Sequence, residues 1–131
     1  MKKIILTVTT LLIFGSTKAQ TIGDHLDRIK AINSNGEFVN TVNNYSYTYI
    51  DPNDNLFVYS LDNNLICENI VIKLNSDKAI QSWIQMLNTV WTPVEENIWS
   101  YQREDSVMIG TKMMTVEDED IGTIFVIGYY K

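Results

Sequence analysis

The sequence predicts an α+β domain in which two helices pack on an antiparallel sheet of about six strands, in the order α-β-β-β-α-β-β-β. Three observations favour this fold. Residues 105–131 contain two apolar, β-rich runs around the acidic tetrapeptide 117–120, which is typical of a long hairpin. Residues 45–74 contain alternating segments separated by turns rich in Asp and Asn. Two further segments, 22–32 and 80–91, carry apolar residues at helical spacing.

The N-terminus has the pattern of a secretory signal peptide. Two lysines follow the initiator methionine, residues 4–14 form an apolar run, and Ala19 is the small residue that a signal peptidase prefers. The run has 11 residues, whereas a membrane-spanning helix needs about 20. We therefore expect cleavage after Ala19, with residues 1–19 as signal peptide and residues 20–131 as a single α+β domain. The mature chain is predicted to be exported, to the periplasm or the exterior, with no membrane span.

Charge and cysteine content exclude several classes of protein. Removing residues 1–19 removes three of the 10 basic residues and none of the 16 acidic ones, so seven remain against 16 and the mature net charge is −9. Such a chain repels phosphate backbones, and we expect no nucleic-acid partner. Cys67 is the only cysteine and cannot form an internal disulfide, so packing must stabilise the fold.

The first helix is expected to begin near residues 21–24, which have the spacing of a capping box. Residues 33–36 tolerate left-handed geometry and are expected to end it, and residues 37–44 are expected to form a loop. The apolar stripe of this helix comprises Ile22, Leu26, Ile29 and Ile32.

A three-stranded meander follows over residues 45–50, 55–61 and 65–74, with turns at 51–54 and 62–64. These turns would place Tyr47 opposite Val58. The core face of the meander would then comprise Tyr45, Tyr47, Tyr49, Leu56, Val58, Ile66, Ile70, Ile72 and Leu74.

The second helix is expected to begin at Ser76, a good N-cap, and to end before Pro93. A short strand at 98–102 leads into the closing hairpin. With its turn at 117–120, this hairpin would pair Ile109 with Gly128. The apolar stripe of the helix comprises Ile80, Trp83, Ile84, Leu87 and Trp91.

Glu68 is the first candidate for a functional residue, because the predicted register places it in the middle of the apolar face. A carboxylate there would have a raised pKa unless hydrogen bonds stabilised it, and the hydroxyls of Tyr47 and Tyr49 are available partners. The alternative is a β-bulge after the second turn, which would turn Glu68 to solvent. We favour the bulge, because three-residue turns often bring one.

The closing hairpin provides the second candidate site, because both of its faces are apolar whereas a sheet with one wet face should alternate. Helices can cover one face, and the other needs a loop, a ligand or another subunit. Methionine side chains adapt to a binding surface but also fill ordinary cores. The ligand-binding candidates are therefore Tyr47, Tyr49, Glu68, Met108, Met114 and Phe125.

Motifs for metal binding and catalysis are weak. The segment 51–62 starts like a calcium loop but has Leu56 where the loop needs glycine and Asp62 where it needs glutamate. His25 is the only histidine, at the start of a helix, and would act with Cys67 only if the fold joined them. We predict no catalytic residue, no metal site and no cofactor.

These observations favour an exported, non-catalytic binding module that uses its sheet to hold a protein, a second copy of itself or a small apolar ligand. One alternative is a carboxylate-dependent enzyme with Glu68 in a pocket. The other is an inhibitor-like protein that inserts the acidic tip 117–120 into a basic cleft of its partner.

Overall fold

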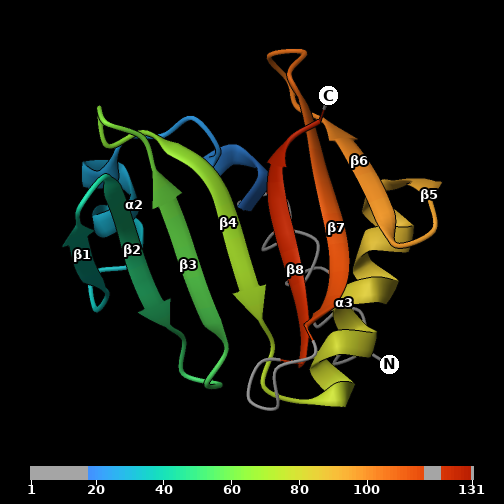
Figure 1. The fold of residues 1–131 in the computed structure, drawn as a ribbon. Helices are drawn as coiled ribbons and strands as arrows, with labels where there is room; N and C mark the ends of the chain where they lie inside the picture. The colour runs from blue at the N-terminus through green and yellow to red at the C-terminus, as the bar shows by residue number, and fades with distance from the viewer. Residues whose placement is uncertain (1–17, 117–121, 131) are drawn as a thin grey trace.

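A computed structural model describes residues 18–116 and 122–130 of the chain. The described residues form one antiparallel sheet of eight strands in the order β1-β2-β3-β4-β8-β7-β6-β5 (Figure 1). Three short helical segments accompany it, at residues 18–21, Leu26–Ile32 (α2) and Asp77–Val90 (α3). The prediction of two helices on about six strands is therefore wrong, because the chain is richer in strands than its patterns indicated.

The first half of the chain is α2 followed by a four-stranded meander. Its strands are β1 (Glu37–Thr41), β2 (Asn44–Ile50), β3 (Leu56–Leu61) and β4 (Cys67–Lys73). Neighbouring strands along the chain pair with each other.

The second half repeats this order. After α3 come β5 (Thr92–Glu95), β6 (Ile98–Gln102), β7 (Met108–Val116) and β8 (Gly122–Tyr129). The last strand of each half lies at the centre of the sheet, where β4 pairs with β8. Each half therefore consists of one helix followed by four strands, instead of the predicted three.

The two strands that the sequence did not reveal, β1 and β5, are the two edges of the sheet. Four of the five β1 residues and all four of β5 are exposed, so neither shows a buried period of two. Pro93 lies inside β5, and an edge strand tolerates proline because one side of it makes no ladder hydrogen bonds.

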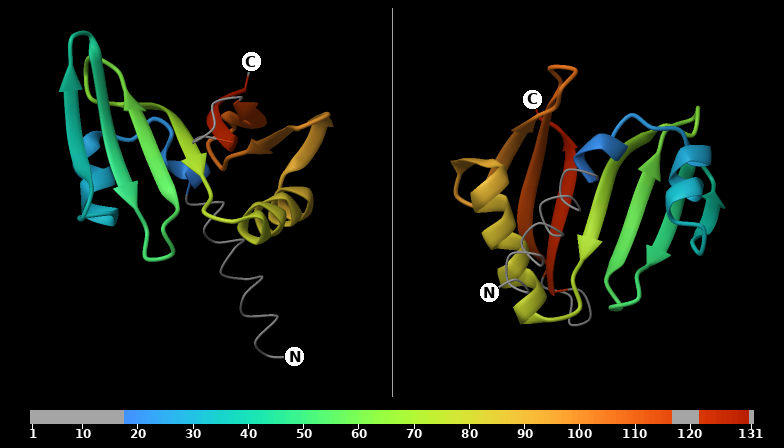
Figure 2. Two further views of the ribbon diagram at one scale, coloured as in Figure 1. Left: turned by 60° about the horizontal axis from the view of Figure 1, so that its bottom comes forward. Right: turned by 180° about the vertical axis from the view of Figure 1, so that it is seen from behind.

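Both helices lie on the same face of the sheet, which we call the helix face; the opposite side is the outer face (Figure 2). α3 contacts β5 and β6, while α2 lies against the first strands. Residues 18–21 lie between the two helices (Figure 2, right). The core between sheet and helices includes Tyr47, Phe57, Tyr59, Ile70, Ile72, Trp83, Leu87, Ile109, Phe125 and Ile127.

The first helix begins later than the capping-box pattern indicated. His25 is the N-cap of α2, and its Nδ1 accepts a hydrogen bond from the Asp27 amide at 3.1 Å. Residues 22–24 interrupt the helix because they pair with the first residue of β4: the Gly23 amide donates to the Cys67 carbonyl at 2.8 Å. Ile22, Leu26 and Ile29 are buried, as the apolar stripe predicts, whereas Ile32, its fourth member, is exposed.

The registers of two hairpins differ by one residue from the predicted ones. Ile50 pairs with Leu56, so the first turn takes in residues 51–55 and Tyr47 faces Tyr59. Phe57, Tyr59 and Leu61 are therefore the core residues of β3, whereas Val58 lies on the outer face. An extra turn residue moves a whole strand to the other face, because side chains alternate along it.

The same shift occurs in the closing hairpin. Val116 pairs with Gly122, so Ile109 faces Tyr129 and Gly110 faces Gly128. The turn between them, including the acidic tip 117–120, lies outside the described residues. The helix face of this hairpin comprises Ile109, Thr111, Met113, Phe125 and Ile127.

Candidate functional site

The first candidate site is the place that residues 18–22 fill on the helix face. Lys18 is 3% exposed and Ala19 is completely buried, although the sequence predicts both to belong to the signal peptide. Ile22 is buried beside them. The end of the predicted leader thus packs into the core of this chain.

The Lys18 ammonium lies against two aromatic rings of β3. Its Nζ is 4.3 Å from the centroid of the Phe57 ring and 5.0 Å from that of Tyr59, and it donates a hydrogen bond to the Tyr59 hydroxyl. Contacts of this kind contribute about 2 kcal/mol when they are shielded from water. Burial lowers the pKa of Lys18 from 10.5 to about 8, and the negative charge of Asp51 opposes this lowering.

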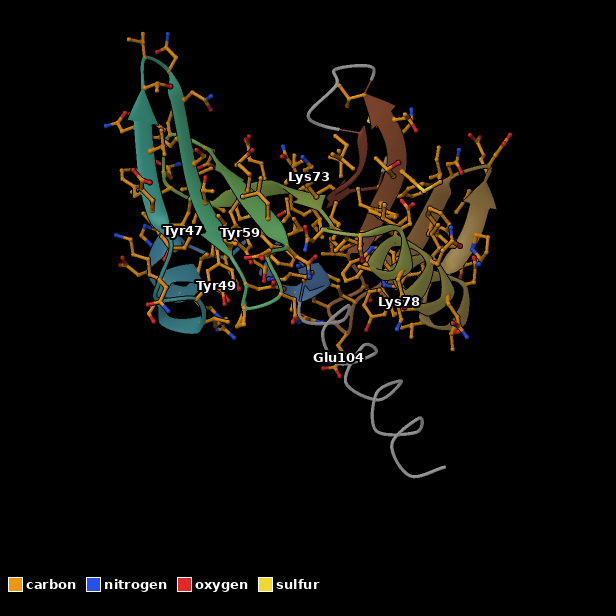
Figure 3. The ribbon with its side chains drawn as sticks, turned by 90° about the horizontal axis from the view of Figure 1, so that it is seen from below. Tyr47, Tyr49, Tyr59, Lys73, Lys78 and Glu104 are labelled. Carbon is orange, nitrogen blue, oxygen red and sulfur yellow. The ribbon has the colours of Figure 1, made fainter. Side chains whose placement is uncertain are left out.

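The rings of Phe57 and Tyr59 form the walls around the Lys18 ammonium, and they also make contacts that do not involve Lys18. Tyr49 stacks on Phe57 with ring centroids 6.2 Å apart, and Tyr47 packs against Tyr59 at 6.3 Å. The Asn33 amide also donates to the Tyr59 hydroxyl at 3.1 Å. Figure 3 shows the three tyrosines together beneath β2 and β3, on the side of the sheet that carries α2.

Arg103, which follows β6, holds the backbone of the N-terminal segment. Its Nη1 donates to the Ile22 carbonyl at 2.6 Å and to the Ala19 carbonyl at 3.3 Å. Its other nitrogens form a two-point ion pair with Asp105, at 2.8 and 3.2 Å. The Arg103 guanidinium keeps the pKa of the Asp105 carboxyl below its ordinary value, helped by a hydrogen bond from the Val107 amide.

A cleft of about 620 Å³ lies between the β2–β3 turn and the start of α3. Asp51, Asn55 and Trp83 are among its lining residues. The charge of Asp51 also acts on the Lys18 ammonium, so one residue that lines the cleft also influences that ammonium.

The second candidate site is the outer face, across which one row of residues crosses six strands. Each residue of this row pairs with the next one on the neighbouring strand. We call it the valine row; it comprises Thr48, Val58, Val71, Val126, Lys112 and Ile98. Both helices lie on the other side of the sheet (Figure 2).

A shallow groove of about 370 Å³ lies at one end of this face. Gly110 and Gly128 form part of its floor and Tyr130 is among its walls. A Cβ on Gly110 would be 2.9 Å from the Tyr130 ring, so the glycine admits that ring to the sheet surface. Gly128 therefore pairs with Gly110 and not, as the predicted register had it, with Ile109.

The predicted ligand-binding residues do not come together. Tyr47, Tyr49 and Phe125 belong to the helix face, where Tyr47 and Phe125 are buried in the core. Met108 and Met114 lie on the outer face, and Met114 is exposed.

Glu68 is exposed, at a β-bulge. Ser60 pairs with Asn69 and Leu61 with Cys67, which leaves Glu68 as the extra residue. This is the bulge that the sequence pattern favoured, and it leaves Glu68 exposed, whereas Tyr47, one of its two predicted partners with Tyr49, is buried in the core.

His25 and Cys67 are close along the backbone but differ in environment. His25 forms an isolated bridge with Ile66, next to Cys67. Cys67 is completely buried, and burial raises its pKa to about 12. A nucleophilic thiol requires a lowered pKa, so this arrangement does not activate the sulfur.

Within residues 18–116 and 122–130, no group of three or more His, Cys, Asp or Glu side chains is placed to hold a metal ion. In the same part of the chain, no helix is long and apolar enough to cross a bilayer.

No protein-family model, curated protein or solved structure matches this chain. The two candidate sites therefore rest on the chain's own residues. Sequence patterns missed the Lys18 site, because Lys18 belongs to the predicted leader and the aromatic alternation of Phe57 and Tyr59 was assigned to the wrong face. That alternation was the one signal that could have revealed it.

Proposed function

We propose that this chain is an exported, non-catalytic binding module that docks a partner protein on the outer face of its sheet. The observation that carries the proposal is the valine row, which crosses six strands on the face that α2 and α3 do not cover.

The shape of this face favours a protein over a small ligand. Six strands spaced about 4.8 Å apart span about 24 Å, which suits an interface of roughly 800 Å² per partner. Small molecules bind in concave sites that enclose them, and the groove beside Tyr130 is shallow. A groove of about 370 Å³ suits a single anchoring side chain of a partner.

The charges on this face indicate the chemistry of the partner. The mature chain is strongly acidic, yet Lys73 on β4 and Lys112 on β7 lie on either side of β8, in the middle of the sheet. Figure 3 shows Lys73 on the side opposite the tyrosine cluster. The valine row continues at its two ends onto carboxylates, because Glu37 pairs with Thr48 and Glu95 pairs with Ile98. A partner surface with apolar side chains, carboxylates over the central lysines and basic groups at the ends complements this arrangement.

Native mass spectrometry of untagged protein, recovered from its own cell envelope, tests the proposal. We expect a complex with a second protein. Val71→Glu, which puts a carboxylate in the middle of the valine row, should abolish the complex. Val42→Glu introduces the same group at a position that is 91% exposed in the β1–β2 turn, so it should leave the complex intact.

Lys112→Glu provides a second test, because its side chain is exposed and the change does not disturb the core. We expect it to weaken the complex, since it reverses a charge that faces the partner. Far-ultraviolet circular dichroism and the thermal midpoint show that each variant is folded. A bare monomer, a small apolar adduct in place of a protein, or a complex retained by both Val71→Glu and Lys112→Glu would refute the proposal.

A further inference from the structure

The place that Lys18 occupies has the features of a binding site for a primary ammonium group. The centroid of the Phe57 ring is 4.3 Å from the nitrogen, and the Tyr59 ring meets the nitrogen at its edge, where the hydroxyl accepts the hydrogen bond. Aromatic faces attract cations through their quadrupoles, most strongly where water is excluded. Here the chain holds one of its own side chains in the position of a ligand.

That side chain belongs to the segment that processing would remove. Cleavage after Ala19 takes away Lys18 and Ala19 and leaves Gln20 as the new N-terminus. The backbone beyond it stays anchored, because the Ile22 carbonyl still accepts from Arg103 at 2.6 Å and the Gly23 amide still donates to the Cys67 carbonyl.

The walls of the site also contact residues that processing leaves in place. Phe57 stacks on Tyr49, Tyr59 packs on Tyr47, and Asn33 holds the Tyr59 hydroxyl. A site whose walls keep their positions without the ligand binds at a lower entropic cost than one that must be assembled.

The surroundings favour a cation. The charge of Asp51 acts on the Lys18 ammonium, and Asp51 also lines the cleft between the β2–β3 turn and α3. The mature chain carries a net charge of −9, which raises the local concentration of small cations.

We propose that removal of residues 1–19 opens this aromatic site and that the mature protein binds a primary alkylammonium ligand there, with an alkyl chain the length of a lysine side chain. The proposal rests on the export and processing that form part of the proposed function. In the full chain, Lys18 occupies the site and excludes the ligand.

The test uses n-butylamine as the probe and 1-butanol as its uncharged analogue, at pH 7, followed by ¹H–¹⁵N correlation spectra. Three proteins are compared in the same mild detergent: mature protein from the envelope, full chain made without membranes so that it stays uncleaved, and full chain with Lys18→Ala. We expect the mature protein and Lys18→Ala to bind butylammonium at least tenfold more tightly than butanol, and the unmodified full chain to show no saturable binding.

Two further variants of the mature protein locate the site. Phe57→Leu removes one ring face and should weaken butylammonium binding by tenfold or more. Tyr59→Phe keeps the ring but removes the hydroxyl, and should weaken binding severalfold with little change for butanol. The thermal midpoint of each variant verifies that it is folded.

Equal affinity for amine and alcohol, binding to the unmodified full chain, or no binding to both the mature protein and Lys18→Ala would overturn the proposal. Intact mass shows separately where processing occurs, and an exported form that retains Lys18 would overturn the opening step. The proposed partner protein binds the outer face, whereas the ammonium site lies on the helix face. The docking proposal and the ammonium proposal are therefore tested by different measurements, and either can fail without the other.

Discussion

The ring of Tyr47 occupies the space that a side chain on Gly36 would need. A Cβ built on Gly36 would be 2.3 Å from the Tyr47 Cζ atom. The two residues are also joined by a hydrogen bond, from the Gly36 amide to the Tyr47 hydroxyl at 2.9 Å. This hydroxyl donates in turn to the Asn33 carbonyl, so the loop after α2 is fixed directly on β2.

Gly36→Ala is therefore expected to destabilise the protein by about 2 kcal/mol or more, the upper range for an added methyl group that a packed core cannot admit. Urea unfolding of the mature protein measures the change. Gly128→Ala is the matched control, because a Cβ there would be 3.5 Å from the Glu68 carbonyl, an ordinary contact. Equal losses of stability in Gly36→Ala and Gly128→Ala would contradict the assignment of the effect to the Tyr47 ring.

Cys67 provides a prediction for alkaline pH. Burial raises its pKa from 9.0 to about 12, so the folded protein keeps a proton that the unfolded chain releases above pH 9. Because the folded state binds more protons in this window, stability falls as the pH rises from 9 towards 12. The fall is about 1.4 kcal/mol for each pH unit at most.

Cys67→Ala should thus show a shallower loss of stability between pH 9 and pH 10.5 than the parent protein. Urea unfolding at several pH values measures both slopes. Burial also raises the pKa of Tyr59, and the negative charge of Cys67 adds to that rise, so Cys67→Ala reduces this second contribution in the same direction. Parallel curves would show that the thiol is not the group responsible.

Sequence patterns found the interior of this sheet and missed its edges. Strands with one buried face have a period of two, and β3 alternates between core and outer face along its whole length. β1 and β5 bury almost nothing, so no periodicity distinguishes them from loops. The number of strands therefore could not be read from hydrophobic pattern alone.

The faces of the sheet that the side chains occupy were predicted wrongly because the lengths of the turns were predicted wrongly. Residues 51–55 form the first turn, held by the carboxylate of Asp51, and the extra residue Asn55 moves Phe57 and Tyr59 onto the helix face. A turn over residues 51–54 and a turn over residues 51–55 are equally compatible with the Asp- and Asn-rich sequence. The aromatic surroundings of Lys18 could not be predicted for this reason, and also because no local pattern relates a residue of the predicted leader to a distant strand.

The β2–β3 turn yields a third prediction. Asp51 Oδ1 accepts hydrogen bonds from the amides of Asn53 and Asn55, each at 2.9 Å. The Asn55 side chain in turn accepts from the Asn75 amide at 2.8 Å, which ties the turn to the start of α3. Asp51→Ala should cost about 1 to 2 kcal/mol, because it leaves these amides without their acceptor.

Asp51→Asn keeps an acceptor oxygen in the same place, so its loss of stability should be less than half that of Asp51→Ala. Thermal unfolding separates the two variants, and amide exchange at Asn55 should accelerate only in Asp51→Ala. Equal destabilisation would mean that the charge of Asp51 matters more than the hydrogen bonds to its oxygen.

Arg103 yields the fourth prediction, because its side chain is only 9% exposed and joins the end of β6 to the N-terminal segment. Its hydrogen bond to the Ile22 carbonyl, at 2.6 Å, is expected to remain after processing. Arg103→Met keeps the aliphatic stem and removes the guanidinium. We expect a loss of about 2 kcal/mol, the range for a hydrogen bond from a charged donor.

Asp105→Ala is the matched control. It removes the ion pair but leaves Arg103 in place, and the Asp105 side chain is 55% exposed, so solvent already screens its charge. Its thermal midpoint should change much less than that of Arg103→Met. Amide exchange at Gly23, which donates to Cys67, should accelerate about tenfold or more in Arg103→Met and remain unchanged in Asp105→Ala. Acceleration in both would show that the ion pair, rather than the bond to Ile22, holds this segment on the sheet.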